Sequence, residues 1–374
     1  MKQNFKNFSK VVLSIFIIII MNVSSSLACT RVLLENKYGI NIGRNMDWAG
    51  AEYAKHKLLI LPRGIERTGE VSGNSAKWTS KYGSLVMTMY DLGVVGGINE
   101  KGLNVEALYL VASDYGIRNE KITGINIAIY SQYILDNFAS VKEAIAYLKA
   151  NELQLVSLTL PGFDKPAGLH FAIADNSGDN AIIEYIDGKL RIYNDKNYKI
   201  LTNDPTYNEQ LKNLKQYKNY GGSLEIPSGF TPSDRFVRTT YNLNLAVEHK
   251  NSNKNLKMLG DIMANAAQPD IKNVRPDATG PESSATSYTS VADLTNLMFY
   301  VTFLDNHSVL KVDIKKLNFS KNSPEMMFDI EKNNFHGDIT DKFQKIQKPF
   351  KFLNIVEYEK MTPQERAKVL GIVS

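Results

Sequence analysis

The chain has 374 residues, of which 43% are hydrophobic and 22% charged, with 24 Gly and 12 Pro. This balance is typical of globular proteins and excludes a collagenous, low-complexity or wholly disordered chain. The formal net charge is +5, but three of the positive charges (Lys2, Lys6 and Lys10) lie in the first ten residues. The remainder is close to neutral, so nucleic acid is not an expected partner.

Residues 1–28 have the three-part pattern of a secretory signal. The lysines form a positive start, Val11–Met21 is an almost unbroken apolar run, and Ser26 and Ala28 are small residues before a cleavage site. The apolar run is only half of the roughly 20 residues that a membrane-spanning helix needs, which disfavours an uncleaved anchor. We expect a signal peptide over 1–28 and a single domain over 29–374. We also expect export to the periplasm or the exterior, without stable membrane insertion after cleavage.

Predicted strands come first in the mature chain, joined by tight turns. They cover 29–34, 40–42, 58–61, 84–90, 94–98 and 103–110. Two predicted helices follow, over 125–136 and, with a capping box at Ser140, over 140–150. The remaining order is three strands, two helices and three strands: 169–174, 181–186, 189–193; 207–218, 256–266; 288–294, 296–303, 309–314.

Hairpins outnumber βαβ crossovers in this order, which favours antiparallel sheets covered by helices in an α+β fold. An Asp187-Gly188 pair predicts a type I′ turn. The segment 268–287, rich in Pro, Asp, Gly and Ser, is predicted to be a long surface loop. The tail from Asn318 is polar and charged and carries no functional signal.

Cleavage after Ala28 would make Cys29, the only cysteine in the sequence, the first mature residue. Its α-amine, with a reference pKa near ~8, could take the proton of its own thiol, whose reference pKa is near ~8.5. Two alternatives stay open. In a conventional Cys–His hydrolase, His170 would be the base, although it lies in an apolar, strand-like run. In a lipid-anchored binding protein, Cys29 would be acylated, although Ser26 stands where such signals usually have Leu.

Five short segments, in order along the chain, carry a family resemblance: Cys29-Thr30-Arg31, Gly43–Trp48, Asn99–Leu103, Leu201–Pro205 and Ser233–Phe236. Together they closely resemble the choloylglycine hydrolase family, which contains penicillin V acylases and conjugated bile salt hydrolases, and in particular its exported Gram-negative members. The resemblance runs from residue 29 to about residue 314. It implies a four-layer αββα N-terminal nucleophile hydrolase sandwich of two antiparallel sheets. It also implies hydrolysis of a linear C–N amide in a small-molecule substrate, no metal or organic cofactor, and a homotetramer.

The resemblance also implies roles for individual residues. Cys29 would be the nucleophile and, through its amine, the proton carrier. Asp47 would hold that amine, and Arg44 would place positive charge near the thiol and favour the thiolate. Asn203 would donate its side-chain N–H to the oxyanion, and Arg235 would complete the polar network. Without the resemblance, a surface ion pair, a turn residue and a helix salt bridge would be the simpler interpretations.

Tyr109 departs from the bile salt hydrolase pattern, which has Asn in the strand after the 99–102 turn, and resembles the penicillin V acylases. Its backbone N–H could still serve the oxyanion. Its ring, together with Trp48, would offer flat apolar surface to an acyl or aryl group, although core packing is nearly as good an explanation for Trp48. We therefore expect an exported amidase acting on penicillin V-like substrates, with N-acyl homoserine lactones as further candidates. The alternative is a conjugated bile salt hydrolase.

Overall fold

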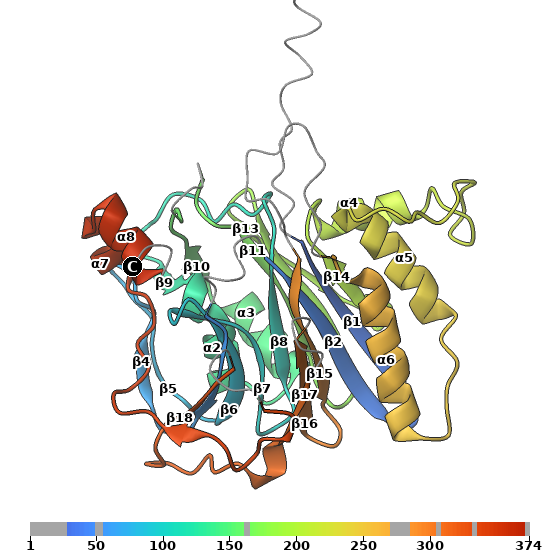
Figure 1. The fold of residues 1–374 in the computed structure, drawn as a ribbon. Helices are drawn as coiled ribbons and strands as arrows, with labels where there is room; N and C mark the ends of the chain where they lie inside the picture. The colour runs from blue at the N-terminus through green and yellow to red at the C-terminus, as the bar shows by residue number, and fades with distance from the viewer. Residues whose placement is uncertain are drawn as a thin grey trace, which may run out of the picture.

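The computed structural model describes residues 28–48, 55–160, 165–269, 285–303, 308–330 and 335–370. Residues 1–27 and most of the segment 268–287 lie outside these ranges, so the signal peptide and the long loop stay predictions. Within the described ranges, two large β-sheets lie face to face (Figure 1).

The first sheet has seven strands in the described residues, in the order β14–β1–β2–β15–β16–β17–β19. Neighbouring strands are antiparallel, except for the parallel pair β17–β19. The strands are β14 (Ile200–Thr202), β1 (Ala28–Asn36), β2 (Gly39–Asp47), β15 (Thr286–Asp293), β16 (Met298–Phe303), β17 (Val309–Asp313) and β19 (Gly337–Asp338).

The second sheet has nine strands in the described residues, all paired antiparallel, in the order β13–β12–β11–β8–β7–β6–β3–β18–β20. The strands are β13 (Lys189–Asn194), β12 (Asn180–Ile186), β11 (Leu169–Ala174), β8 (Asn104–Tyr109), β7 (Gly93–Asn99), β6 (Ser84–Met89), β3 (Lys57–Leu61), β18 (Met326–Asp329) and β20 (Gln344–Lys345).

Helices cover the outer face of each sheet, which confirms the predicted four-layer αββα sandwich (Figure 1). On the first sheet, α5 (Pro232–Asn244) and α6 (Ser252–Ala266) pack against β1, β2 and β14. On the second sheet, α2 (Ile127–Asn137) packs against β7 and β8, followed by α3 (Val141–Ala150). Gly43 lets α6 approach β2, since a Cβ there would lie 2.7 Å from the Met263 side chain.

The remaining elements are short and lie at the edges of the sandwich. They are β4 (Glu66–Thr68), β5 (Lys77–Thr79), the parallel pair β9 (Thr123–Asn126) and β10 (Leu153–Val156), α4 (Tyr207–Leu214), the 3₁₀ turn η2 (Ile314–Lys316), α7 (Ile355–Lys360) and α8 (Pro363–Val369). The polar tail is therefore structured. Its strands β18 and β20 extend the second sheet, and Ile355 and Tyr358 of its helix α7 pack in an apolar cluster with Val71 and Leu158.

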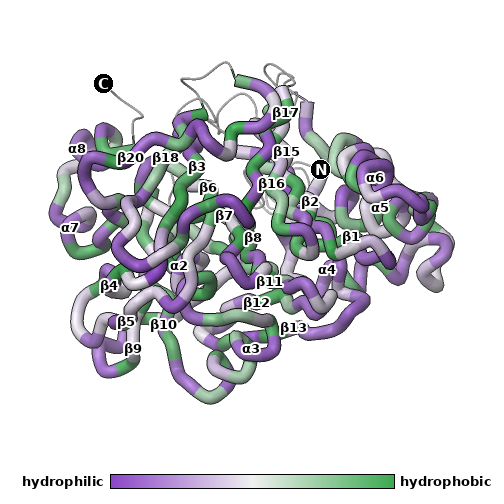
Figure 2. Tube along the Cα trace, turned by 90° about the horizontal axis from the view of Figure 1, so that it is seen from below, coloured by the Kyte–Doolittle hydropathy of each residue, from purple (hydrophilic) through white to green (hydrophobic). Residues whose placement is uncertain are grey.

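Two apolar cores account for the layering. One contains Ile42 and Met46 of the first sheet together with Leu108 and Ala172 of the second, and the other joins the second sheet to α2 and α3. Figure 2 shows hydrophobic stretches on interior strands such as β3 and β8, and hydrophilic stretches along loops at the rim. Among the helices of the described residues, none combines the length and the hydropathy needed to cross a bilayer.

The predicted elements agree with the structure except near some boundaries. The helix predicted from residue 125 begins at Ile127, because the Asn126 side chain caps it and residues 123–126 pair with β10. The helix predicted to reach residue 218 ends at Leu214. Thr286 and Ser287, which were predicted to be loop, begin β15. Asp187 and Gly188 both have positive φ, 54° and 68°, as the predicted type I′ turn requires.

Candidate active site

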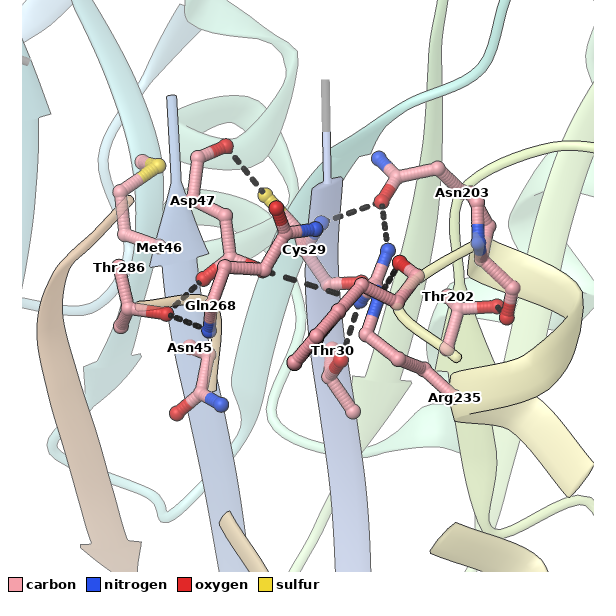
Figure 3. Close-up of polar contacts among 12 residues, drawn as sticks. Cys29, Thr30, Asn45, Met46, Asp47, Thr202, Asn203, Arg235, Gln268 and Thr286 are labelled. Carbon is pink, nitrogen blue, oxygen red and sulfur yellow. Dashed lines mark hydrogen bonds and ion pairs between the residues drawn. The ribbon is translucent and has the colours of Figure 1, made fainter. Parts of the chain in front are cut away.

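Strand register brings three of the predicted site residues together at one end of the first sheet. The two-residue turn between β1 and β2 pairs Cys29 with Met46 and Ala28 with Asp47. On the other edge of β1, Thr30 pairs with Thr202, so Asn203 directly follows the strand that flanks Cys29. Strand β1, which lies between β14 and β2, thus has Asp47 on one side of Cys29 and Asn203 on the other (Figure 3).

The Cys29 thiol is buried, with 2% of the residue exposed, and lies between two polar groups. Its Sγ is 3.9 Å from the Asp47 carbonyl oxygen and 3.9 Å from Nη2 of Arg44. Burial raises the pKa of the thiol, and the positive charge of Arg44 opposes this rise. In the full-length chain, the thiol is therefore held in its neutral form.

The backbone nitrogen of Cys29 donates a hydrogen bond to Oδ1 of Asn203 (Figure 3). In the full-length chain this nitrogen belongs to the Ala28–Cys29 peptide bond, and it stands where an α-amine would lie after cleavage. The Asn203 side chain is fully buried, and its Nδ2 donates to the Tyr109 carbonyl oxygen over 2.7 Å. Asn203 therefore connects Cys29 on the first sheet to β8 on the second.

Arg235 reaches the same point from the first turn of α5 (Figure 3). Thr231 caps this helix, and Pro232 begins it. The buried guanidinium donates through Nη1 to the Cys29 carbonyl oxygen over 2.7 Å, and through Nη2 to Asn203 Oδ1 over 3.2 Å. It fixes the backbone of the nucleophile candidate and the amide of Asn203 at the same time.

The Asp47 carboxylate lies on the β2 side of Cys29. Its Oδ1 accepts a hydrogen bond from the Thr286 hydroxyl, and its Oδ2 is 3.7 Å from Nη1 of Arg235. Burial raises the pKa of Asp47 to about 7, against the opposing effects of Arg235 and Thr286. Asp47 thus connects to Cys29 through Arg235 and through its own carbonyl oxygen.

Arg44 is held by partners that the sequence analysis missed. Its Nε is 3.2 Å from Oε2 of Glu106, its Nη1 donates to the Tyr288 hydroxyl over 2.8 Å, and its Nη2 donates to the Ala107 carbonyl oxygen over 2.8 Å. Glu106 comes from the second sheet and is 3% exposed. Gly96 makes room for this carboxylate, because a Cβ at residue 96 would lie 2.1 Å from Glu106 Oε2.

An apolar cavity opens on the other side of the thiol. It contains about 790 Å³ of space not occupied by atoms, part of it continuous with solvent. Its walls are almost wholly apolar. They come from Cys29, Arg44, Met46, Trp48, Met89, Tyr90, Leu92, Gly93, Val94, Val95, Ala107, Tyr109, Ile127, Ala128, Leu158, Leu160, Ala167, Leu169, Leu353 and Leu370.

Trp48 and Tyr109 both line this cavity, with their rings edge to face and their centroids 5.9 Å apart. Trp48 also donates its indole N–H to the Tyr90 hydroxyl over 2.7 Å. Burial raises the pKa of Tyr109, and the nearby Asp204 adds to this rise, so the phenol is neutral. The two residues therefore form an aromatic wall beside the thiol, as the sequence predicts.

His170, the alternative base, is paired elsewhere. Its Nδ1 lies 3.1 Å from Oε1 of Glu184 on the neighbouring strand, and both side chains are fully buried. The Cys29 thiol instead contacts the Asp47 carbonyl oxygen and the Arg44 guanidinium. In the described part of the chain, no three His, Cys, Asp or Glu side chains are grouped in a way that could hold a metal ion.

Two antiparallel sheets stacked between helical layers, with a buried thiol beside two arginines and an amide at the end of β1, define the fold of the N-terminal nucleophile hydrolases. Comparison with known families agrees. The sequence model described as "Linear amide C-N hydrolases, choloylglycine hydrolase family" matches residues 29–329. The chain belongs to the choloylglycine hydrolase family and is an enzyme that hydrolyses linear C–N amides.

Relatives of known activity extend over most of the chain. A penicillin V acylase of Pectobacterium atrosepticum is 32% identical over 360 residues, covering 88% of this chain and 93% of the relative. A bile salt hydrolase/transferase of Clostridium perfringens is 29% identical over 328 residues, covering 79% and 94%. The structure of penicillin V acylase from Agrobacterium tumefaciens has a TM-score of 0.77 and 33% identity, covering 87% of this chain and 100% of that chain.

Proposed function

We propose that this enzyme is a penicillin V acylase-like amidase whose nucleophile is Cys29 at the N-terminus of the mature chain. The observation that carries the proposal is the position of the Cys29 thiol, between a buried cluster of charged groups and an apolar cavity. Acyl transfer from an amide needs a nucleophile, a proton carrier and a donor to the oxyanion, and this cluster contains groups suited to each task.

The reaction begins when the α-amine of Cys29 takes the thiol proton and the thiolate attacks the amide carbonyl carbon. The carbonyl oxygen becomes an oxyanion, which the second N–H of Asn203 Nδ2 and the backbone N–H of Tyr109 stabilise. When the intermediate collapses, the C–N bond breaks and the leaving amine takes the proton from the α-ammonium. A water molecule then gives its proton to the α-amine, attacks the thioester and releases the acid and the thiol.

Charge balance supports a role for cleavage in activation. In the buried cluster, Arg44 lies beside Glu106 and Arg235 beside Asp47, so each cation near the thiol has a carboxyl group as its partner. Release of residues 1–28 would place a titratable amine beside the thiol, in contact with Asn203 Oδ1. The added positive charge would lower the pKa of the thiol, because an opposite charge favours the thiolate.

The apolar cavity supports substrates with an apolar acyl group. Its walls can bury an aryl or alkyl group, while the leaving amine would remain on the solvent side of the thiol. The relatives named above include a penicillin V acylase. The family resemblance of the sequence also likens Tyr109 to the acylases rather than to the bile salt hydrolases. We propose penicillin V-like amides as substrates, with N-acyl homoserine lactones as a second group that joins an apolar acyl arm to a small ring.

The test is a comparison of three amides with purified mature enzyme: phenoxymethylpenicillin, a long-chain N-acyl homoserine lactone and glycocholate. We expect kcat/KM to be highest for one of the first two and lowest for glycocholate. Turnover of glycocholate alone would overturn the acylase proposal and favour the bile salt hydrolase alternative. Cys29→Ala is expected to abolish turnover of every substrate. A Cys29→Ala variant with full activity would contradict the assignment of Cys29 as the nucleophile.

The N-terminus distinguishes the remaining alternatives. Sequencing and mass measurement of the N-terminal peptide should give a free Cys29, whereas a diacylglyceryl adduct would identify a lipid-anchored protein. Ala28→Leu, which removes the small residue before the predicted cleavage site, should leave an uncut and inactive chain. An active uncut form that loses activity in His170→Ala would instead identify a Cys–His hydrolase.

We also propose that the mature enzyme is exported to the periplasm and assembles as a homotetramer. The three-part pattern of residues 1–28 supports export. Release by osmotic shock and a mass of four chains by light scattering are the expected results. Retention in the cytoplasmic fraction, or a monomer at working concentration, would contradict the respective proposal.

A further inference from the structure

Part of the wall of the apolar cavity comes from a segment of the chain beyond the family match. Leu353 and Leu370 both line the cavity, whereas the family model matches only as far as residue 329. Both side chains are buried, at 7% and 2% exposure. We call residues 353–370, which include α7 and α8, the C-terminal wall.

Hydrogen bonds join the start of the C-terminal wall to other segments that line the cavity. The Leu353 N–H donates to the Leu92 carbonyl oxygen over 3.0 Å, and the Leu353 carbonyl oxygen accepts from Asn126 Nδ2 over 2.6 Å. Leu92 is a cavity residue, and Asn126 caps the helix that begins with the cavity residue Ile127. The C-terminal wall is therefore built into the cavity rather than laid across its surface.

The helices of the C-terminal wall are anchored as well. Tyr358 of α7 is buried in an apolar cluster with Leu158, and its hydroxyl donates to the Thr159 carbonyl oxygen over 3.2 Å. Arg366 of α8 donates to the Tyr358 carbonyl oxygen over 3.1 Å and lies over the Tyr358 ring at 4.9 Å. These contacts hold α8 against α7 and keep Leu370, which directly follows α8, at the cavity.

The C-terminal wall also supports a strained turn at the cavity. Tyr90 and Asp91 have φ values of 58° and 56°, in the left-handed region that non-glycine residues seldom adopt. Each residue of the turn has an anchor: Tyr90 binds the Trp48 indole, Asp91 is 2.6 Å from Lys57 Nζ, and Leu92 accepts from Leu353. Removing the last of these anchors would loosen the part of the cavity that carries Tyr90 and Leu92.

We propose that the C-terminal wall is a specificity determinant, in which Leu353 and Leu370 contact the end of the acyl group and set the largest acyl group accepted. This inference rests on the proposed function, in which the acyl group occupies the apolar cavity. Leu353 and Leu370 offer only methyl and methylene groups, so an acyl group that ends in a methyl or an aryl edge fits. An acyl group with a charged or hydroxylated end would lose its hydration there without a hydrogen-bond partner.

The test changes the size of residue 370 in both directions and uses N-acyl homoserine lactones from butanoyl to dodecanoyl. Leu370→Trp should lower kcat/KM for the longest substrates by about tenfold relative to the shortest, because buried methylenes discriminate on this scale. Leu370→Ala should shift the preference toward longer chains. Lys368→Trp, an exposed change in the last turn of α8, should leave the ratio of long to short substrates unaltered.

A second readout separates this inference from the proposed function. Calorimetry with dodecanoate and butanoate gives the ratio of their dissociation constants without any turnover. In each Leu370 variant, this ratio should shift in the same direction as the kcat/KM ratio: toward short chains in Leu370→Trp and toward long chains in Leu370→Ala. If neither ratio changes, or if every chain length is affected equally, the inference is wrong. If the variants shift the ratio of dissociation constants but no amide is cleaved, the proposed function is wrong. The inference that the C-terminal wall selects acyl-chain length then still holds. Should Leu370→Trp fail to fold, the opposite shift expected for Leu370→Ala decides.

Discussion

The Cys29 thiol has two unlike sides. The polar side contains Arg44, Asp47, Asn203 and Arg235, which come from paired strands, the residue after a paired strand and the first turn of a capped helix. Each has at least two hydrogen-bond or ion-pair partners. On the apolar side, the cavity is lined largely by turns, strand ends and the C-terminal wall. The difference indicates that strand register positions the chemistry, whereas variable segments select the substrate. Changes on the polar side should slow all substrates equally, and changes on the apolar side should re-rank them.

Arg44→Ala should have the largest effect, because it leaves Glu106 buried without its counter-charge. A broken buried pair destabilises by about 3–5 kcal/mol, measurable as a loss in the free energy of unfolding by urea. The change also removes the positive charge that lowers the pKa of the Cys29 thiol. The acid limb of kcat/KM should therefore move to higher pH, with the rate at pH 6 falling more than at pH 9. Arg63→Ala, which breaks the exposed pair with Glu100, is the control and should cost under about 1 kcal/mol.

Asn203→Ala should come next. Loss of one oxyanion donor lowers kcat by about 10²–10³-fold, and every substrate should be affected by the same factor. The fold-loss in kcat is measured from the rate of amine release with substrates that carry short and long acyl groups. Asn197→Ala, an exposed asparagine shortly before β14, should change nothing. A loss of activity confined to one substrate would mean that Asn203 selects the substrate, as the apolar side does, rather than supports the chemistry.

His56 should give the polar side a pH-dependent stability. Burial lowers the pKa of His56 to about 4, and Arg44 adds to this effect. Since the reference value is near ~6.5, the folded state binds fewer protons than the unfolded state between about pH 6.5 and 4, so stability is present above this window and is lost as the pH falls through it. The loss amounts to up to about 3 kcal/mol. His56→Gln should flatten the pH dependence of the urea midpoint, and His336→Gln, an exposed change, should leave it as it is.

Trp48→Phe should have the smallest effect and act on the apolar side. It removes the hydrogen bond to the Tyr90 hydroxyl, which is worth about 1 kcal/mol, while keeping an aromatic ring beside Tyr109. We expect the order of KM values among substrates to change and kcat to change little. Trp78→Phe is a matched control, because its indole N–H donates to Asp136, away from the cavity. An equal loss for all substrates would mean that Trp48 supports the chemistry itself.

The sequence predicted those parts of the fold and the site that depend on local pattern. The hairpin of β1 and β2 follows from its short turn, and that turn's register places Cys29 beside Asp47. The family motifs, not periodicity, supplied Asn203 and Arg235, which the structure brings into contact with Cys29. The catalytic roles of these residues remain predictions.

Residues whose importance comes from contacts between distant segments were missed. Glu106 stands alone in an apolar strand, and its partner Arg44 lies on the other sheet. That isolated carboxylate in a buried strand was the one available signal, since a buried charge requires a counter-charge. Leu353 and Leu370 gave no signal, because the tail that carries them is polar overall and its cavity contacts depend on how α7 and α8 fold back.

Gly96 is a residue outside the site whose lack of a side chain is needed to keep a site residue in place. It lies in the middle of β7, contacts no part of the proposed substrate path, and would pass as a replaceable strand residue in a mutational library. Yet the single methyl of alanine at this position would fall on Glu106 Oε2 and displace the carboxylate from Arg44. In selection experiments, position 96 should therefore tolerate few substitutions, and screens that score only residues near the thiol would overlook it.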